Sequence, residues 1–175
     1  MSNVIVSREL LQERFIYDPE TGNFYWRHDM NNGRFKAMTI AGSKNGQGYM
    51  TIKINKKSYK LHRLAWILMT GSEPRGYVDH INRNKSDNRW CNLREASAAE
   101  NQWNHDPHKS NKSGVSGVHF CKRSQRWKAA CKVHGKRYNV GTFREMDQAV
   151  EAITRFRVEH HGEYAAIAKA TGEKL

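Results

Sequence analysis

Two stretches of this chain change from a two-residue to a helical hydrophobic repeat, and each change predicts a small sheet followed by a helix. GYMTIKINKKSYK, residues 48–60, alternates around a polar turn, and LHRLAWILM after it places apolar residues at i, i+3, i+4 and i+7. Three strand-like runs between residues 115 and 143 precede a second such helix, which Gly162 ends. With 175 residues, the chain is long enough for one ordinary or two small α+β domains.

The other segments predict short elements. SRELLQER, residues 7–14, predicts a helix, and the aromatic-rich run to Arg27 predicts a hairpin around a turn that contains Pro and Gly. The segment that follows, up to about Asn45, carries no regular pattern. Three elements are expected in the middle of the chain: a strand over 77–81, an extended piece over 92–94 and, after a Ser-x-x-Glu capping box, a helix over about 98–105.

Basic residues are concentrated in two windows. Lys and Arg outnumber Asp and Glu by 30 to 17, which gives a formal net charge of +13. Residues 30–72 contain eight Lys or Arg and residues 107–143 contain nine, and neither window contains an acid. This charge predicts a polyanionic partner such as nucleic acid or an acidic membrane, with a merely soluble basic protein as the alternative. Acids lie between the windows, as in a metal site flanked by DNA-holding surfaces.

Neither a membrane segment nor a disulfide framework is expected. No stretch approaches 18 apolar residues, the N-terminus lacks the basic start and apolar core of a signal peptide, and there is no long basic amphipathic helix. The three cysteines, Cys91, Cys121 and Cys131, form no CxxC pair and cannot all pair within one chain. The sequence therefore predicts a reduced cytoplasmic setting and no membrane partner.

The stretch VDHINRNKSDNRWCNLREASAAENQWN, residues 78–104, carries the residues of a phosphodiester-cleaving site. Such cleavage needs a base to activate water and a cation to stabilise the charge that develops on the phosphate and the departing oxygen. His80 can act as the base because imidazole titrates near neutral pH. Asp79 and a later Asn offer the hard oxygen ligands that Mg²⁺ prefers.

This stretch resembles the HNH endonuclease motif in its phage and intron-associated form, a hairpin and helix that hold one divalent metal. YDPETGNFYW, GYMTIKINKKSYKLHRLAW and DHIN precede the rest of the motif in the order found in homing endonucleases. The resemblance implies an N-terminal region of β-hairpins joined to a ββα-metal nuclease module. It also implies double-stranded DNA as the partner and Mg²⁺, or another divalent cation such as Mn²⁺, as the cofactor.

The resemblance assigns a role to four residues. Asp79 is the first metal ligand and His80 the general base. Asn92, 12 positions after His80, bridges the hairpin loop and holds the base in place. Asn101, 21 positions after His80, is the second metal ligand, where the motif's name has a His. His105, one helical turn beyond Asn101, is a candidate additional partner.

Simpler interpretations exist for several of the polar and aromatic residues. Turn formation accounts for most loop asparagines, here Asn82, Asn84 and Asn88. A zinc site on Cys91, His105 and His108 is disfavoured because structural zinc uses four ligands in close pairs. His62 either approaches DNA or enters the core. Core packing competes with base stacking for three tryptophans: Trp66, Trp90 and Trp103.

SGVHFCKRSQRWKAACKVHGKRYNVGTF, residues 116–143, and the helix after it resemble the ethylene-response-factor (Apetala-two) type of DNA-binding domain. That family has a three-stranded antiparallel sheet packed on one helix, with the other sheet face in the major groove. Alternation places Trp127, Ala129, Cys131, Val133, Tyr138 and Val140 in the core. The groove-facing positions implied by the family and by alternation are Ser116, His119, Lys128, Ala130, Lys132, Arg137 and Asn139. The alternative is a solvated basic face.

The sequence thus predicts a metal-dependent HNH DNA endonuclease, a homing endonuclease of phage origin that acts as a monomer in the bacterial host cytoplasm. A non-catalytic DNA-binding regulator with a decayed nuclease half is the alternative, and an RNA-binding accessory protein is a third. In the first domain, the expected DNA contacts are Lys53, Lys56, Lys57 and Arg63. The expected domains are a nuclease module at 1–106 (a β-rich segment at 1–60 and the motif core at 61–106), a linker at 107–114, a DNA-binding domain at 115–164 and a tail at 165–175.

Overall fold

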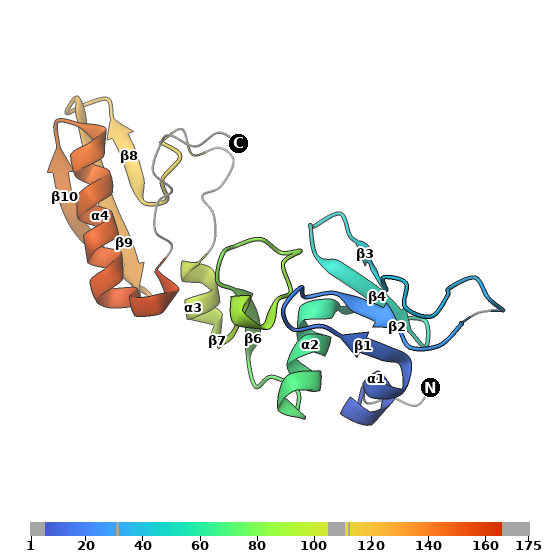
Figure 1. Cartoon of the computed structure of the whole chain (residues 1–175). Coiled ribbons are helices and arrows are strands. Elements are labelled where there is room, and N and C mark those ends of the chain that lie inside the picture. Colours follow the sequence, from blue (N-terminus) through green and yellow to red (C-terminus); the bar gives the residue numbers. More distant parts are fainter. Residues whose placement is uncertain (1–5, 31, 105–110, 112, 166–175) are drawn as a thin grey trace. The chain divides into compact units, whose positions relative to one another are not determined.

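The computed structural model describes residues 6–30, 32–104, 111 and 113–165. It contains two compact units, Met1–Ser97 and Ala98–Leu175, each with its own hydrophobic core. Several small antiparallel sheets and four α-helices make up the described residues, which confirms the α+β prediction (Figure 1). No helix in these ranges combines the length and apolarity needed to cross a bilayer. His105, His108, most of the predicted linker and almost all of the predicted tail lie outside the described residues.

The first unit consists of short strands around two α-helices. Its elements are α1 (Arg8–Arg14), β1 (Phe15–Tyr17), β2 (Phe24–Trp26), β3 (Ser43–Lys44), β4 (Met50–Ile54), β5 (Lys57–Lys60), α2 (Leu61–Thr70), β6 (Tyr77–His80), the 3₁₀ turn η1 (Trp90–Asn92) and β7 (Leu93–Ala96). They form three antiparallel sheets, β1-β2, β3-β4-β5 and β6-β7. The short strand β3 was not predicted, because two residues are too few to produce a periodic pattern.

Helix α2 supplies the centre of the first core. Leu61, Leu64, Ala65 and Leu68 are all buried, so the predicted apolar stripe is confirmed. The helix ends at Gly71, whose left-handed backbone (φ +80°) lets its N–H donate to the Ile67 carbonyl. The same core contains Leu11 of α1 and the aromatic rings of the β1-β2 hairpin. This packing fixes the strand that follows α2, because Val78 of β6 belongs to the same cluster.

The second unit contains one sheet and the helix that covers it. Its elements are α3 (Ala98–Trp103), β8 (Val118–Cys121), β9 (Arg126–Val133), β10 (Lys136–Phe143), α4 (Met146–His161) and the 3₁₀ turn η2 (Gly162–Tyr164). The strand order is β10-β9-β8, all antiparallel, and α4 lies along one face of the sheet (Figure 1). The predicted three-strand and one-helix pattern is therefore present in this unit.

The second core lies between the sheet and α4. It is formed by Val115, Val118, Ala129, Cys131, Ala149 and Ile153, with Trp127 and Val140 packed against it. Tyr138 also faces the helix, since its ring lies 5.7 Å from that of Phe156. A side chain at Gly117 would meet the Ala130 carbonyl oxygen and the Ile153 side chain, and its φ of +78° favours glycine, so this position holds the entry to β8 close to the core.

Candidate functional site

Asp79 and His80 lie at the end of β6, in the two-stranded sheet of the first unit. Asp79 pairs with Arg94 across the sheet and His80 pairs with Leu93. Both polar side chains are buried, with exposed fractions of 7% and 4%. Ionisable side chains are seldom this buried unless hydrogen bonds or opposite charges compensate them. The partners of these two residues therefore define the site.

His80 is held by Asn88. The Nε2 atom of the ring lies 3.1 Å from Asn88 Oδ1, and Asn88 is 2% exposed. The backbone carbonyl of Asn88 in turn accepts a hydrogen bond of 2.7 Å from the Tyr17 hydroxyl of the first hairpin. An amide oxygen accepts a hydrogen bond, so the Nε2–H of His80 is the donor, and in the neutral ring this contact favours the tautomer with Nε2 protonated and the lone pair on Nδ1. The expectation that Asn88 only forms a turn is wrong; it is a buried partner of the imidazole.

The surroundings of His80 lower its pKa below the usual value. Burial is the largest cause, because it disfavours the charged imidazolium. The hydrogen bond to Asn88 and the charges of Asp79 and Asp87 oppose burial and raise the pKa. The net effect keeps the ring neutral at physiological pH, which is the form that can accept a proton.

Asn92 ties the loop between β6 and β7 together. Its Oδ1 accepts from the backbone N–H of Asn82 at 2.9 Å, and its Nδ2 donates to the carbonyl of Asp87 at 2.8 Å. The other two asparagines form the expected turns, since Asn82 Oδ1 accepts from the Asn84 N–H and Asn84 Oδ1 accepts from the Ser86 N–H. The side chain of Asn92 thus spans the loop that carries Asn88.

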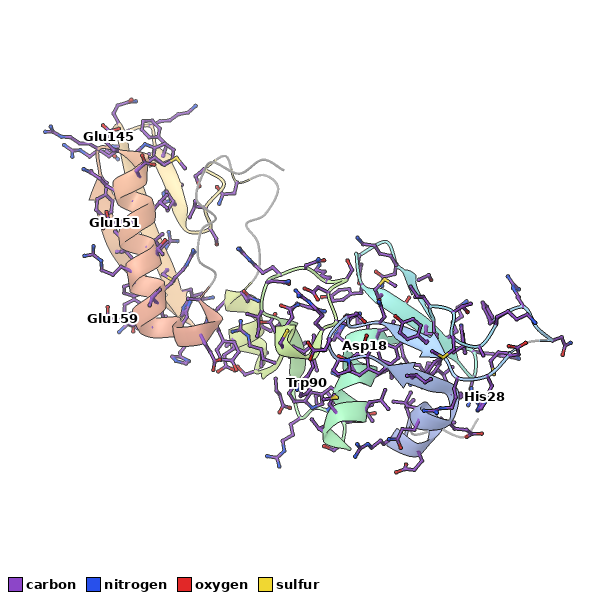
Figure 2. The ribbon with its side chains drawn as sticks, in the orientation of Figure 1. Asp18, His28, Trp90, Glu145, Glu151 and Glu159 are labelled. Carbon is purple, nitrogen blue, oxygen red and sulfur yellow. The ribbon has the colours of Figure 1, made fainter. Side chains whose placement is uncertain are left out.

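The first hairpin supports the same loop from outside the motif. The backbone N–H of Trp90 donates to the Pro19 carbonyl at 2.9 Å. A Cβ at Gly22 would collide with the backbone nitrogen of Arg89, so this hairpin turn packs directly on the loop. The ring of Trp90, which is labelled in Figure 2, lies 5.2 Å from that of Trp66. Both rings pack against the first core, as the core interpretation expects. The hairpin, far away in sequence, therefore fixes the position of Asn88.

Asp79 carries an ion pair with Arg94. Asp79 Oδ2 lies 3.0 Å from Arg94 Nε and 2.9 Å from Arg94 Nη2, and both side chains are almost fully buried. A carboxylate is a hard oxygen donor of the kind that Mg²⁺ binds while it keeps several waters. Among the described residues, no three His, Cys, Asp or Glu side chains are grouped as a ready metal cage. The oxygen donor of Asp79 is therefore of the type that suits Mg²⁺.

Two further aromatic rings lie against His80. The ring centroid of His62 lies 4.8 Å away, with the rings nearly perpendicular, and that of Tyr49 lies 6.1 Å away. His62 is 4% exposed, and its Nδ1 has no hydrogen-bond partner within the described residues of the chain. Burial, with the charges of His80, Lys60 and Arg63, lowers the pKa of His62 to about 3, so this imidazole is neutral. His62 therefore belongs to the core beside His80.

The predicted basic contacts of the first unit differ in their surroundings. Lys53, Lys56 and Lys57 are exposed on the β4-β5 hairpin. Arg63 is half-buried, lies 3.6 Å from Glu73 and donates to the Gly76 carbonyl. The alternation of the sequence predicts an exposed Lys60, but this residue is half-buried at the junction of β5 and α2, where its ammonium group lies over the Tyr49 ring.

Residues 59–103 match the HNH endonuclease family. Protein 3.8 of Escherichia phage T7 is 36% identical over 118 residues, which cover 63% of this chain and 97% of that protein. This chain belongs to the Protein 3.8 family. An uncharacterized HNH endonuclease of Acanthamoeba polyphaga mimivirus is 31% identical over 109 residues, which cover 61% of this chain and 56% of that protein. No solved structure matches the chain significantly.

The HNH domain contains all four residues of the predicted motif. Asp79, His80 and Asn92 lie in the first unit, and Asn101 lies in α3, which groups with the second unit. The role of Asn101 as a metal ligand stays a prediction, as do the roles of the other three. The family match ends at residue 103, so the likeness of the second unit to ethylene-response-factor domains also stays a prediction.

The outer face of the second sheet carries most of the predicted groove-facing residues. His119 pairs with Lys128, Ala130 with Asn139 and Lys132 with Arg137, so these residues share the face opposite α4. His119, Lys132, Arg137 and Asn139 are exposed, whereas Ser116, Lys128 and Ala130 are half-buried. The register shifts between Asn139 and Gly141, a bulge that the sequence pattern does not reveal.

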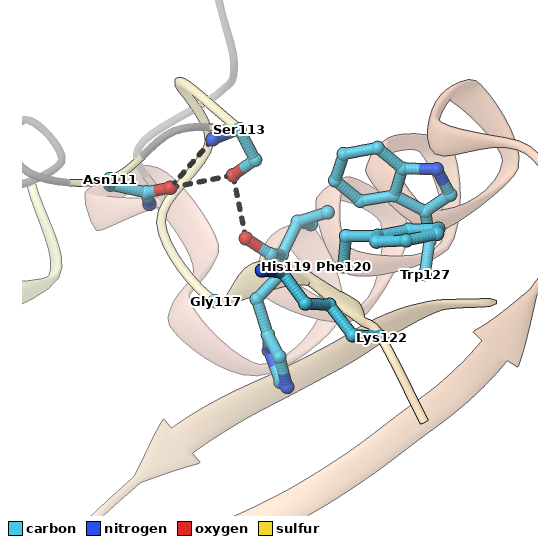
Figure 3. A pocket seen from close by; sticks show the side chains of 8 residues that line it. Asn111, Ser113, Gly117, His119, Phe120, Lys122 and Trp127 are labelled. Atoms are coloured by element: carbon cyan, nitrogen blue, oxygen red, sulfur yellow. Dashed lines mark hydrogen bonds between the residues drawn. The ribbon is translucent and has the colours of Figure 1, made fainter. Parts of the chain in front are cut away.

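A pocket adjoins one end of this sheet (Figure 3). Its lining consists of His119, Phe120, Lys122 and Trp127 together with Asn111, Ser113, Gly117 and Val118. The Phe120 and Trp127 rings meet edge to face at 5.2 Å, and Phe120 is exposed. Ser113 fixes the segment before β8, because its hydroxyl donates a hydrogen bond to the Val118 carbonyl at 2.6 Å. The pocket therefore lies beside His119, at the edge of the outer basic face.

Proposed function

We propose that this protein is a metal-dependent DNA endonuclease whose HNH domain hydrolyses phosphodiester bonds. The observation that carries the proposal is the buried His80, held by Asn88 at Nε2 and placed beside the Asp79 carboxylate within an HNH domain. A buried imidazole with one nitrogen fixed by an acceptor is arranged to take a proton through the other nitrogen. Such an arrangement would be an unusual use of polar groups in a purely structural loop.

In this proposal, His80 is the general base. Its Nδ1 accepts a proton from the water that attacks phosphorus, and the Asn88 contact keeps the ring in the required tautomer. Asn92 acts as a positioning residue, because it ties together the loop that carries Asn88. The lowered pKa of His80 keeps the base unprotonated at neutral pH.

Asp79 is the proposed anchor of the cofactor, with Asn101 as the second ligand assigned by the motif. When bound, Mg²⁺ or Mn²⁺ supplies positive charge that stabilises the phosphate and the leaving 3′ oxygen. Arg94 neutralises the Asp79 carboxylate in the metal-free protein, as its two contacts to Oδ2 indicate. Arg94 would then share this carboxylate with a bound cation or give it up.

The second unit is proposed to choose and hold the DNA. Its outer face presents His119, Lys132, Arg137 and Asn139 from three neighbouring strands, and cationic groups on a sheet face suit the phosphates beside a DNA groove. The exposed lysines of the β4-β5 hairpin would add phosphate contacts near the reaction centre. We further propose a homing role and a monomer that nicks DNA, because one candidate reaction centre is found among the described residues and the chain has two unlike units.

A non-catalytic DNA-binding regulator remains the second candidate function, favoured by the basic face of the second unit and the net charge of +13. Supercoiled plasmid separates the two candidates. The wild type with Mg²⁺ should convert the plasmid to nicked or linear DNA, while chelator or His80→Ala should abolish the conversion without loss of binding. Binding by both proteins with no cutting of plasmid or phage DNA under any divalent metal would support the regulator.

A further inference from the structure

Two lysines meet at one aromatic ring beside His80. Lys60 Nζ lies 4.0 Å and Lys85 Nζ lies 5.0 Å from the centroid of the Tyr49 ring. The Tyr49 ring also faces the imidazoles of His62 at 5.3 Å and His80 at 6.1 Å. Both ammonium groups therefore contact the same ring that faces the proposed base.

The lysines reach this ring from distant regions of the sequence. Lys60 is the last residue of β5 and precedes the first residue of α2. Lys85 occupies a turn of the β6-β7 loop, which Asn84 closes by accepting from the Ser86 N–H and through its carbonyl from the Asp87 N–H. The end of β5 and the turn in the β6-β7 loop thus each place one positive charge at the Tyr49 ring. The turn formed by Asn84 sets the position of Lys85.

No described carboxylate is paired with either of these two positive charges. Neither ammonium group has an ion pair or hydrogen bond to a carboxylate within the described ranges of the chain. Burial lowers the pKa of Lys60, and the neighbouring charges of Lys85 and Arg63 lower it further. The Tyr49 ring attracts both cations, yet a cation–π contact leaves the N–H donors open to an anion.

We propose that Lys60 and Lys85, spaced by Tyr49, form a phosphate-binding site that holds a DNA phosphodiester next to His80. Two ammonium groups can donate to the nonbridging oxygens of one phosphate, which relieves their mutual repulsion. The identification of DNA as the natural ligand of this site rests on the proposed nuclease function. It adds substrate-positioning residues that the HNH motif pattern does not assign in this chain.

Inorganic phosphate provides a test that does not depend on DNA cleavage. Metal-free full-length protein is titrated with phosphate while the aromatic NMR signals of Tyr49, His62 and His80 are followed. We expect saturable shifts at these rings. Lys60→Gln/Lys85→Gln should weaken phosphate binding by roughly tenfold or more, because each lost contact is a charge-assisted hydrogen bond. Lys36→Gln/Lys136→Gln removes the same charge from exposed positions elsewhere and should bind phosphate as the wild type does.

A parallel NMR titration with a short DNA duplex shows whether the site also binds a phosphate of a DNA strand. We expect the aromatic signals of Tyr49, His62 and His80 to shift with the duplex as they do with inorganic phosphate. In single-turnover cleavage, the Lys60/Lys85 variant should react roughly tenfold more slowly than the control variant. Equal phosphate affinity in the two double variants, or no saturable shift in the wild type, would overturn the site. Absence of cleavage by every protein would overturn the proposed function while the phosphate titration still decides the site.

Discussion

The loop between β6 and β7 and the outer face of the β8-β10 sheet carry polar side chains in opposite ways. At the end of β6 and in the loop after it, Asp79, His80, Asn88 and Asn92 are buried and each has a hydrogen-bond or ion-pair partner. On the sheet, Lys132, Arg137 and Asn139 are exposed on a regular strand surface. Buried polar groups lose stability when one partner is removed, whereas exposed cations contribute little to folding. The first arrangement suits chemistry, and the second suits attraction of a charged polymer.

The largest expected effect on stability comes from the buried ion pair. Arg94→Met should lower the free energy of unfolding of the metal-free protein by about 3 kcal/mol or more, because the Asp79 carboxylate loses its buried ion pair. Mg²⁺ should then raise the melting temperature of the variant more than that of the wild type. Arg155→Met removes an exposed pair with Glu151 and serves as the control. Equal stability of the two variants would refute the difference between the buried and exposed regions.

The Asn88 contact is the next to test. Asn88→Leu should slow DNA cleavage by roughly 100-fold, because the imidazole loses the acceptor that fixes its tautomer. Asn88→Asp keeps an acceptor and adds negative charge, which raises the pKa of His80, so its rate should be higher than that of Asn88→Leu and its pH–rate profile should move to higher pH. Single-turnover rates from pH 5 to 9 measure both. If the two variants share one profile, Asn88 is only a loop residue.

Stability should also depend on pH through His62. Its pKa is about 3 in the folded protein, below the ordinary value, so the unfolded chain takes up a proton that the folded chain excludes. The contribution of neutral His62 is fully present at neutral pH, and about 2 kcal/mol of it should be lost on going from pH 7 to pH 5. Denaturant unfolding of His62→Phe should show a weaker dependence over this range, whereas the exposed His28→Phe (Figure 2) should match the wild type.

The smallest individual effects are expected on the sheet. Lys132→Gln and Arg137→Gln should leave the melting temperature unchanged and weaken DNA binding by about 1 kcal/mol or less each. Each should reduce the dependence of log affinity on log salt by about one, as expected for a phosphate contact. Anisotropy titrations at several salt concentrations measure this slope. An unchanged slope in the Lys132→Gln/Arg137→Gln double variant would remove this face from the DNA interface.

Local patterns in the sequence predicted the elements well. The stripe of α2, the alternation of β9 and the capping box before α3 depend on neighbours within one turn or one strand, so they can be read directly. The faces of the second sheet followed from the same rule. The bulge after Asn139 and the two-residue strand β3 could not be predicted, because neither changes the hydrophobic pattern.

The candidate site was only partly predictable. The motif identified Asp79, His80, Asn92 and Asn101, but Asn88 was indistinguishable in sequence from Asn82 and Asn84, which do form turns. Its burial depends on Tyr17, more than 70 positions earlier, which contacts its backbone. Tyr49, Lys60 and Lys85 likewise come together only through tertiary packing. Long-range contacts of this kind leave no periodic signal in a single sequence.

Chemical rescue of His80→Gly tests the central claim most directly. The glycine leaves space for a free imidazole at the position of the missing ring. With Mg²⁺ and supercoiled DNA, the variant should cut at least roughly 100-fold more slowly than the wild type, and added imidazole should restore some of the rate. The rescued rate should rise with the concentration of neutral imidazole, while Asp79→Gly should gain nothing. If His80→Gly cuts DNA at the wild-type rate without imidazole, the assignment of His80 as the base is contradicted.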